Sequence, residues 1–137
     1  MMEIYQDEYL FTDDDKKIDL NEVCTLLRQS HWAKNRPMGV IEKTIETSLC
    51  FSIYHNDVQI GFARVVSDYA VYSLILDVII DKKYRGIGLA TTLIDFINNH
   101  PRLKDTNKVL WTRNAKDLYS IGKCCNIKNR DTLFFYF

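Results

Sequence analysis

Apolar residues recur along the chain with two different spacings, which divide it into strands and helices. The stretch LCFSIYHNDVQIGFARVVSD, residues 49–68, contains two β-rich runs on either side of Asn56-Asp57. This arrangement predicts a hairpin of antiparallel strands. Residues 71–80, VYSLILDVII, are apolar on both faces, as is typical of a strand at the centre of a sheet.

Other segments carry apolar residues three or four positions apart, which predicts helices. In residues 19–29, DLNEVCTLLRQ, Asp19 stands at the capping position of such a helix. A weaker helical pattern covers roughly residues 39–48. A third helix begins near Leu89, and Pro101 prevents its continuation.

The remaining segments extend this alternation of strands and helices. We expect strands within Glu3–Phe11 and residues 108–112, and in the tail DTLFFYF, residues 131–137. A helix is expected between them, with Asn114 at its N-cap and Gly122 as its terminator. A hairpin followed by the order β-α-β-α-β predicts the α/β (α+β) class with a mixed sheet.

Length and composition restrict the kind of protein. The chain has 137 residues with no internal repeat or linker, so we expect one domain over 1–137. Acidic and basic residues number 18 each, so no basic excess indicates binding to nucleic acid or to a membrane surface. The apolar run at Leu74–Ile80 is too short to span a bilayer, and the N-terminus does not resemble a secretory signal.

The four cysteines show neither metal-ligand spacing nor a disulfide framework; they are Cys24, Cys50, Cys124 and Cys125. We therefore expect no metal, and reduced thiols in a cytoplasmic protein.

The segment RGIGLA, residues 85–90, joins the 71–80 strand to the helix that follows. Its small residues are Gly86, Gly88 and Ala90, and they leave backbone amides accessible at a helix N-terminus, where anions bind favourably. The alternative is that the glycines only permit a tight turn. The dinucleotide-binding fingerprint and the Walker lysine are both absent.

Arg85, Gly88 and Ala90 satisfy the pattern Arg/Gln-x-x-Gly-x-Gly/Ala directly after a strand that ends in V-I-I-D. This segment resembles the acyl-CoA motif of the GNAT superfamily of N-acetyltransferases. Residues 49–88 resemble the central region of a small bacterial GNAT subgroup, and LLRQSHWAKNRP and TRNAKDLYSIG resemble its first-helix and later regions. The resemblance implies a mostly antiparallel central sheet with helices on both faces.

The resemblance also implies acetyl-CoA as cosubstrate and a binding site for it. The pantetheine arm would pair with Val78, Ile79 and Ile80. The pyrophosphate would lie on the amides of the following turn and helix: Arg85, Gly86, Ile87, Gly88, Leu89, Ala90 and Thr91. Tyr119 matches the tyrosine that protonates the departing thiolate, although a tyrosine on an apolar helix face is also a common core residue. Asn114 caps that helix and would also touch the arm.

Candidates on the acceptor side are fewer. Asp77, a lone carboxylate in an apolar strand, either takes the proton of the attacking amine, faces a helix end or pairs with Arg64; water is a further candidate base. Trp32, Arg64 and Asp68 match regions that flank acceptor pockets. Trp32 would either line the pocket or fix the helix to the sheet. Arg64 and Asp68 share strand parity with Phe62, Ile60 and Val58, and would form a buried ion pair or line a pocket.

Two functions follow from these expectations. The first is acetyl transfer from acetyl-CoA to a primary amine of a small molecule or peptide, by direct attack without a covalent enzyme intermediate. The alternative is a non-catalytic CoA-binding or sensor domain, because the chain departs from the superfamily pattern after Tyr119, where Cys124-Cys125 replaces an aromatic residue. The aromatic tail also suggests edge pairing in a homodimer.

Overall fold

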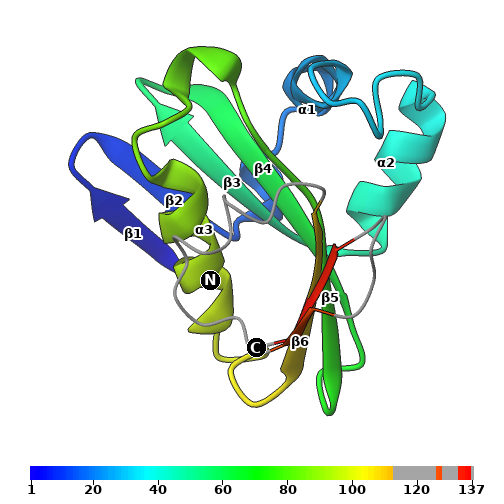
Figure 1. The fold of residues 1–137 in the computed structure, drawn as a ribbon. Coiled ribbons are helices and arrows are strands. Elements are labelled where there is room, and N and C mark those ends of the chain that lie inside the picture. The colour runs from blue at the N-terminus through cyan, green and yellow to red at the C-terminus, as the bar shows by residue number, and fades with distance from the viewer. Residues whose placement is uncertain (113–125, 128–132, 137) are drawn as a thin grey trace.

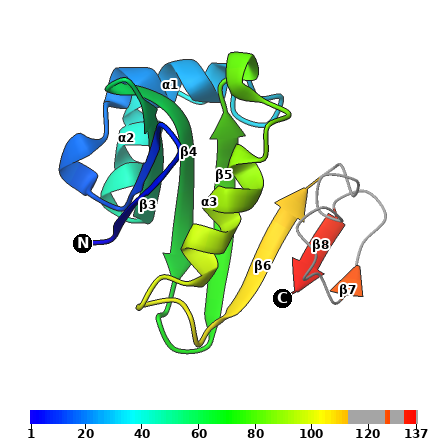
Figure 2. The same ribbon diagram turned by 90° about the vertical axis from the view of Figure 1, so that its left-hand side faces the viewer.

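The computed structural model describes residues 1–112, 126–127 and 133–136, and places their strands in one sheet. The strand order is β1-β2-β3-β4-β5-β6-β8-β7, and only β5 and β6 are parallel neighbours (Figures 1 and 2). The predicted mixed, mostly antiparallel sheet is therefore confirmed. The strands are β1 (Glu3–Gln6), β2 (Tyr9–Thr12), β3 (Leu49–His55), β4 (Val58–Ser67), β5 (Tyr72–Ile80), β6 (Asn107–Thr112), β7 (Asn126–Ile127) and β8 (Leu133–Tyr136).

In the described part of the chain, two of the three predicted helices begin directly after a residue suited to a helix N-terminus. In α1 (Leu20–Arg28), the Asp19 carboxylate accepts hydrogen bonds from the amides of Asn21 and Glu22, as its capping position predicts. Gly88 precedes α3 (Leu89–Asn98) in a left-handed conformation. The weaker pattern is also confirmed as α2 (Met38–Glu46). Short 3₁₀ turns, η1 (Asp15–Lys17) and η2 (Lys82–Tyr84), complete the helical elements described.

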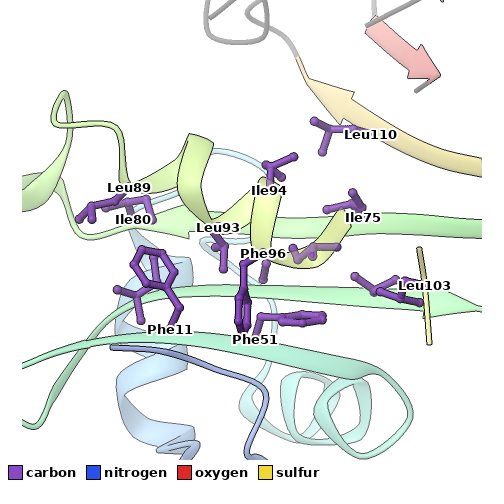
Figure 3. Packing of buried hydrophobic residues seen from close by; sticks show 14 of the residues in the cluster. Phe11, Phe51, Ile75, Ile80, Leu89, Leu93, Ile94, Phe96, Leu103 and Leu110 are labelled. Atoms are coloured by element: carbon purple, nitrogen blue, oxygen red, sulfur yellow. The ribbon is translucent and has the colours of Figure 1, made fainter. Parts of the chain in front are cut away.

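The helices cover both faces of the sheet, as expected. Helices α1 and α2 lie together on one face, where Leu26, Leu27 and Ile41 pack with Phe62 and Ile79 (Figure 1). Helix α3 covers the opposite face. There Phe96 packs edge-on against Phe51, with ring centroids 5.8 Å apart (Figure 3). The sheet is therefore the middle layer of three.

Tight turns join β3 to β4 and β1 to β2. Asn56 and Asp57 both have positive φ, 51° and 64°, so the hairpin between β3 and β4 is confirmed with a turn suited to twisted strands. The short strand expected within Glu3–Phe11 is confirmed as β1, but the second strand, β2, was not predicted. Asp7 turns the chain at φ 54° and produces the β1–β2 hairpin. Aspartate tolerates this conformation better than most residues, and the β-rich composition continues through the turn.

Two irregularities in pairing change which face residues occupy. The β3–β4 register shifts between Ile53 and Tyr54, so Ile60 packs on the α3 face whereas Phe62 packs on the α1–α2 face. The expectation that Val58, Ile60, Phe62 and Arg64 share one face is therefore wrong, since period-two parity does not survive a bulge. The β4–β5 register also shifts, between Phe62 and Arg64.

Strands β5 and β6 separate toward their carboxyl ends (Figure 2). They pair only from Tyr72 to Ile75 on β5, against Asn107 to Leu110 on β6. Trp111 and Thr112 of β6 pair with β8 instead. Among the described residues, the Leu76–Ile80 part of β5 therefore has no strand partner on its β6 side.

The predicted tail strand is confirmed as β8, which lies between β6 and β7. Because β8 is internal to the sheet, the reason for expecting edge pairing through this tail is wrong. The helix expected between Asn114 and Gly122 lies outside the described residues. No helix in the described ranges is long and apolar enough to cross a membrane.

Candidate active site

The turn before α3 presents a row of backbone amides that have no acceptor among the described residues. Gly86 and Gly88 have φ of 81° and 87°, in the left-handed region that side chains other than glycine seldom adopt. The first helical bond runs from the Thr92 amide to the Gly88 carbonyl. Within the described part of the chain, the amides from Arg85 to Thr91 have no hydrogen-bond acceptor. The row is suited to an anionic ligand with several oxygens.

Arg85 connects this turn to the end of β5. Its Nε donates to the Ile80 carbonyl at 2.8 Å, and its Nη2 lies 3.4 Å from Gln29 Oε1. The same Gln29 oxygen accepts from the Lys82 amide at 3.0 Å. Gln29, at the end of α1, thus holds both sides of the turn, a role that no local pattern in the sequence predicted.

An aromatic cluster supports the start of the turn. The Tyr84 hydroxyl lies 3.0 Å from His55 Nδ1, and Glu8 Oε1 lies 3.3 Å from His55 Nε2. The Tyr9 ring packs on both, with centroids 5.0 Å from His55 and 6.2 Å from Tyr84. These residues come from the β1–β2 turn, β2, β3 and η2, so sequence separation concealed the cluster.

The opening between β5 and β6 lies next to the amide row. Ile79 and Ile80 are buried and Val78 is half-buried, so their side chains anchor the strand while its β6-facing backbone edge is open in the described residues. An extended ligand with amide groups can pair with such an edge. The three predicted arm-binding residues therefore lie beside the predicted pyrophosphate turn.

Asp77 lies at the bulge of β5, where Asp77 and Val78 stand opposite Ala63 of β4. Its φ of 53° is unusual for a residue with a side chain. Its Oδ2 accepts from Arg64 Nε at 2.6 Å and from Arg36 Nη1 at 2.7 Å, and its Oδ1 accepts from Trp32 Nε1 at 3.1 Å. The pairing of Asp77 with Arg64, one of the interpretations left open by the sequence, is confirmed.

These partners make Asp77 a weak base. Burial by itself raises the pKa of this carboxyl, but the hydrogen bonds and charges of Arg36 and Arg64 outweigh burial and lower the pKa below its usual value. A carboxylate with a lowered pKa removes a proton poorly from an ammonium of pKa about 10. Asp77, held by two arginines, is therefore poorly suited to act as the general base.

Of the other predicted site residues, Trp32 lies beside Asp77 and Asp68 lies apart from it. Trp32 is 46% exposed in the α1–α2 loop and adjoins Asp77, so it is not a core residue. Asp68 is exposed beyond the end of β4, where it accepts from the amides of the next turn. It neither pairs with Arg64 nor lies on the core face, so the buried ion pair is wrong, whereas its place beside an acceptor pocket stays a prediction. Those hydrogen bonds also lower its pKa. Tyr119 and Asn114 lie outside the described residues.

Arg36 belongs to the site but was not predicted. It lies in the α1–α2 loop, 41 positions before Asp77 in the chain. Its only signal is membership of the stretch SHWAKNRP, and no spacing rule connects that stretch to a bulge in β5.

Known proteins are similar to this chain in sequence or in fold. A family profile described as "Acetyltransferase (GNAT) domain" matches residues 46–120. The uncharacterized N-acetyltransferase ycf52-like protein of Prochlorococcus marinus is 29% identical over 110 residues. That alignment covers 76% of this chain and 61% of the relative, so the chain spans less than two thirds of the relative's length.

Two solved structures illustrate the similarity in fold. One is a GNAT-family protein from Xanthomonas campestris pv. campestris, 30% identical with a TM-score of 0.79, where the match covers 89% of this chain and 88% of the other. The other is a GNAT acetyltransferase from Elizabethkingia anophelis with acetyl-CoA bound, with a TM-score of 0.71 over 96% of this chain and 98% of the other. At 13% identity, the second match shows the fold alone. With the profile matching more than half of its residues, the chain belongs to the GNAT acetyltransferase domain family.

Proposed function

We propose that this protein transfers the acetyl group of acetyl-CoA to a primary amine of a small molecule or peptide. The observation that carries the proposal is the row of amides from Arg85 to Thr91, which have no acceptor in the described part of the chain and lie beside the opening between β5 and β6. A row of donors next to an open strand edge suits a ligand with a pyrophosphate joined to an extended amide chain.

The amide row is the proposed pyrophosphate site. Gly86 and Gly88 have open space where a Cβ would stand, which leaves the amides accessible from that side. Arg85 is engaged with Ile80 and Gln29, so its part is to fix the turn while backbone donors bind the phosphates. Gly88, Leu89 and Thr91 bring the positive end of α3 to the same place.

The proposed chemistry is direct attack by the amine on the thioester carbonyl. A carbon–nitrogen bond forms, the carbon–sulfur bond breaks, and backbone donors of Val78–Ile80 stabilise the charge that develops on oxygen. Tyr119 donates a proton to the departing thiolate, which a weakly acidic phenol can do. We assign removal of the amine proton to water, because Asp77 is held by two arginines.

The competing proposal is a domain that binds CoA without transferring acetyl groups. It is favoured by the sequence after Tyr119, where Cys124-Cys125 stands in place of the aromatic residue usual in the superfamily. Both proposals require the same cofactor site, so they differ only in turnover.

Release of free CoA thiol in the presence of a library of primary amines separates the two. We expect wild type to exceed the rate without amine, and Tyr119→Phe to lose about a hundredfold in kcat while binding acetyl-CoA equally well. Gly39→Ala, a change on an exposed turn of α2, serves as the control and retains wild-type turnover. A wild-type rate that no amine raises above background favours the non-catalytic domain.

A further inference from the structure

The Asp77 cluster contains one carboxylate and two guanidinium groups. Arg36 and Arg64 both bind Asp77 Oδ2, at 2.7 Å and 2.6 Å. Among the described residues, no second carboxylate lies within ion-pair distance of either arginine. The cluster therefore carries one positive charge in excess.

The excess charge is accessible, whereas the carboxylate is not. The side chains of Arg36 and Arg64 are 22% and 14% exposed, and that of Asp77 only 4%. Arg36 donates to Asp77 through Nη1, and in the described part of the chain its other N–H groups have no acceptor. Arg64 also reaches Ser48 Oγ, at 3.4 Å, so Arg36 has more donors available.

The cluster lies close to the proposed reaction centre. Asp77 directly precedes Val78 and stands in the part of β5 that has no described partner on its β6 side. Arg36 and Trp32 approach it from the α1–α2 loop, and the exposed indole of Trp32 provides an apolar surface beside the guanidinium groups. An acceptor that reaches the thioester from this face meets the excess positive charge.

We infer that the acceptor carries a carboxylate close to the amine that is acetylated, and that Arg36 binds this carboxylate. Arginine offers paired donors that match a carboxylate, and this cluster would repel an acceptor whose only charge is an ammonium. The inference rests on the proposed transferase function and specifies its substrate class. Arg64 holds Asp77 in place, and Asp77 in turn orients Arg36.

The first experiment compares amines in pairs that differ only in a carboxylate: phenylalanine with phenethylamine, β-alanine with ethylamine, and lysine with cadaverine. We expect a larger kcat/KM for the carboxylate-bearing member in at least one pair. Arg36→Gln is expected to reduce that kcat/KM about tenfold or more, the effect of losing one charge-assisted hydrogen bond. The kcat/KM of the paired simple amine should not fall, because the same change removes a positive charge that repels its ammonium. Arg36→Lys restores part of the preference because the charge is retained.

A second experiment does not depend on turnover. The probes N-acetylphenylalanine and N-acetylphenethylamine are titrated calorimetrically into the CoA-saturated protein. Tighter binding of the carboxylate probe, lost in Arg36→Gln and kept in Arg28→Gln, supports the inference even if no amine is acetylated. Arg28 is an exposed arginine of α1 outside the cluster and serves as the matched control.

The outcomes for the two proposals are distinguishable. Turnover without any preference for carboxylate-bearing amines overturns the inference and leaves the transferase intact. Failure of both acetylated probes to bind, or equal binding of both by wild type and Arg36→Gln, likewise overturns it. Acetyl-CoA affinity and thermal unfolding of Arg36→Gln are measured in parallel, so that a folding defect is not mistaken for lost recognition.

Discussion

Asp77 illustrates how much a single residue contributes when three partners converge on it. It adopts a left-handed backbone conformation, which costs an ordinary residue about 1 kcal/mol. Hydrogen bonds from Arg36, Arg64 and Trp32 offset that cost. We therefore regard Asp77 as the residue that fixes the α1–α2 loop to the bulge of β5.

The first prediction concerns Asp77→Asn. Because this change leaves two partly buried guanidinium groups without a counter-ion, we expect the free energy of unfolding to fall by about 3 kcal/mol near neutral pH. Urea unfolding measures the loss. Asp95→Asn, an exposed change on α3, should stay within about 0.5 kcal/mol of wild type.

The loss should also depend on pH. The folded-state pKa of Asp77 is lowered, so its carboxylate contributes stability above the unfolded value of about 3.9, and the contribution disappears as the pH falls through the folded pKa. The difference between wild type and Asp77→Asn should therefore shrink as the pH falls below about 4. A difference that is small at neutral pH, or that grows in acid, contradicts the ion-pair account.

The second prediction concerns two glycines, one with a left-handed backbone conformation and one in a helix. Gly88→Ala places a side chain at φ 87° and should destabilise the fold by about 1 kcal/mol, although the added Cβ meets no neighbour. Gly39→Ala, in the first turn of α2 with equal space, should stabilise it by about 0.5 kcal/mol. Thermal unfolding measures both changes, and effects of the same sign would show that backbone conformation does not decide them.

At the scale of elements, one buried pair connects the β1–β2 hairpin to the end of α3. His100 is 4% exposed, and its Nε2 lies 2.7 Å from Asp13 Oδ2. The amide of Arg102 donates to His100 Nδ1 at 3.2 Å, and the ring packs edge-on against Phe51 with centroids 5.5 Å apart. Since Nδ1 accepts, Nε2 carries the proton that Asp13 binds.

The third prediction follows from that geometry. His100→Leu keeps an apolar side chain against Phe51 but leaves Asp13 and the Arg102 amide without this partner, so we expect a loss of about 2 kcal/mol in the free energy of unfolding. Urea unfolding at matched pH measures it. His31→Leu, an exposed histidine of the α1–α2 loop, is the control, and an equal loss there would remove the basis for the connection.

Elements that begin or turn at residues with a strong local preference were predicted from the sequence. Features that depend on how the strands pair were not. Asp19 at the capping position and Asn56-Asp57 at a hairpin turn act within a few residues, so the sequence revealed α1 and the β3–β4 hairpin. The turn at Asp7 and the bulge at Asp77 have no comparable local pattern. The turn at Asp7 depends on the pairing of β1 with β2. The bulge at Asp77 depends on β4 and on Arg36 and Arg64, which are distant in sequence.

At the scale of the molecule, the proposed cofactor and acceptor sites are built from opposite faces of the sheet. Helix α3 begins at the amide row, and α1 and α2 with their loop supply Gln29, Arg36 and Trp32 from the other face. The opening between β5 and β6 lies between these two layers. The proposed cofactor site could be predicted because RGIGLA is contiguous, whereas the proposed acceptor side is assembled from separate segments and was only partly predicted.

The central claim is that the Arg85–Thr91 amides and the open edge of β5 bind acetyl-CoA. Calorimetric titration of acetyl-CoA into the wild-type protein and into Gly88→Val tests it most directly, with Gly39→Ala as the folded control. The account predicts saturable one-to-one binding by wild type and Gly39→Ala, and affinity at least about tenfold weaker in a folded Gly88→Val. No binding by wild type up to about 1 mM, or equal affinity in all three proteins, would contradict it.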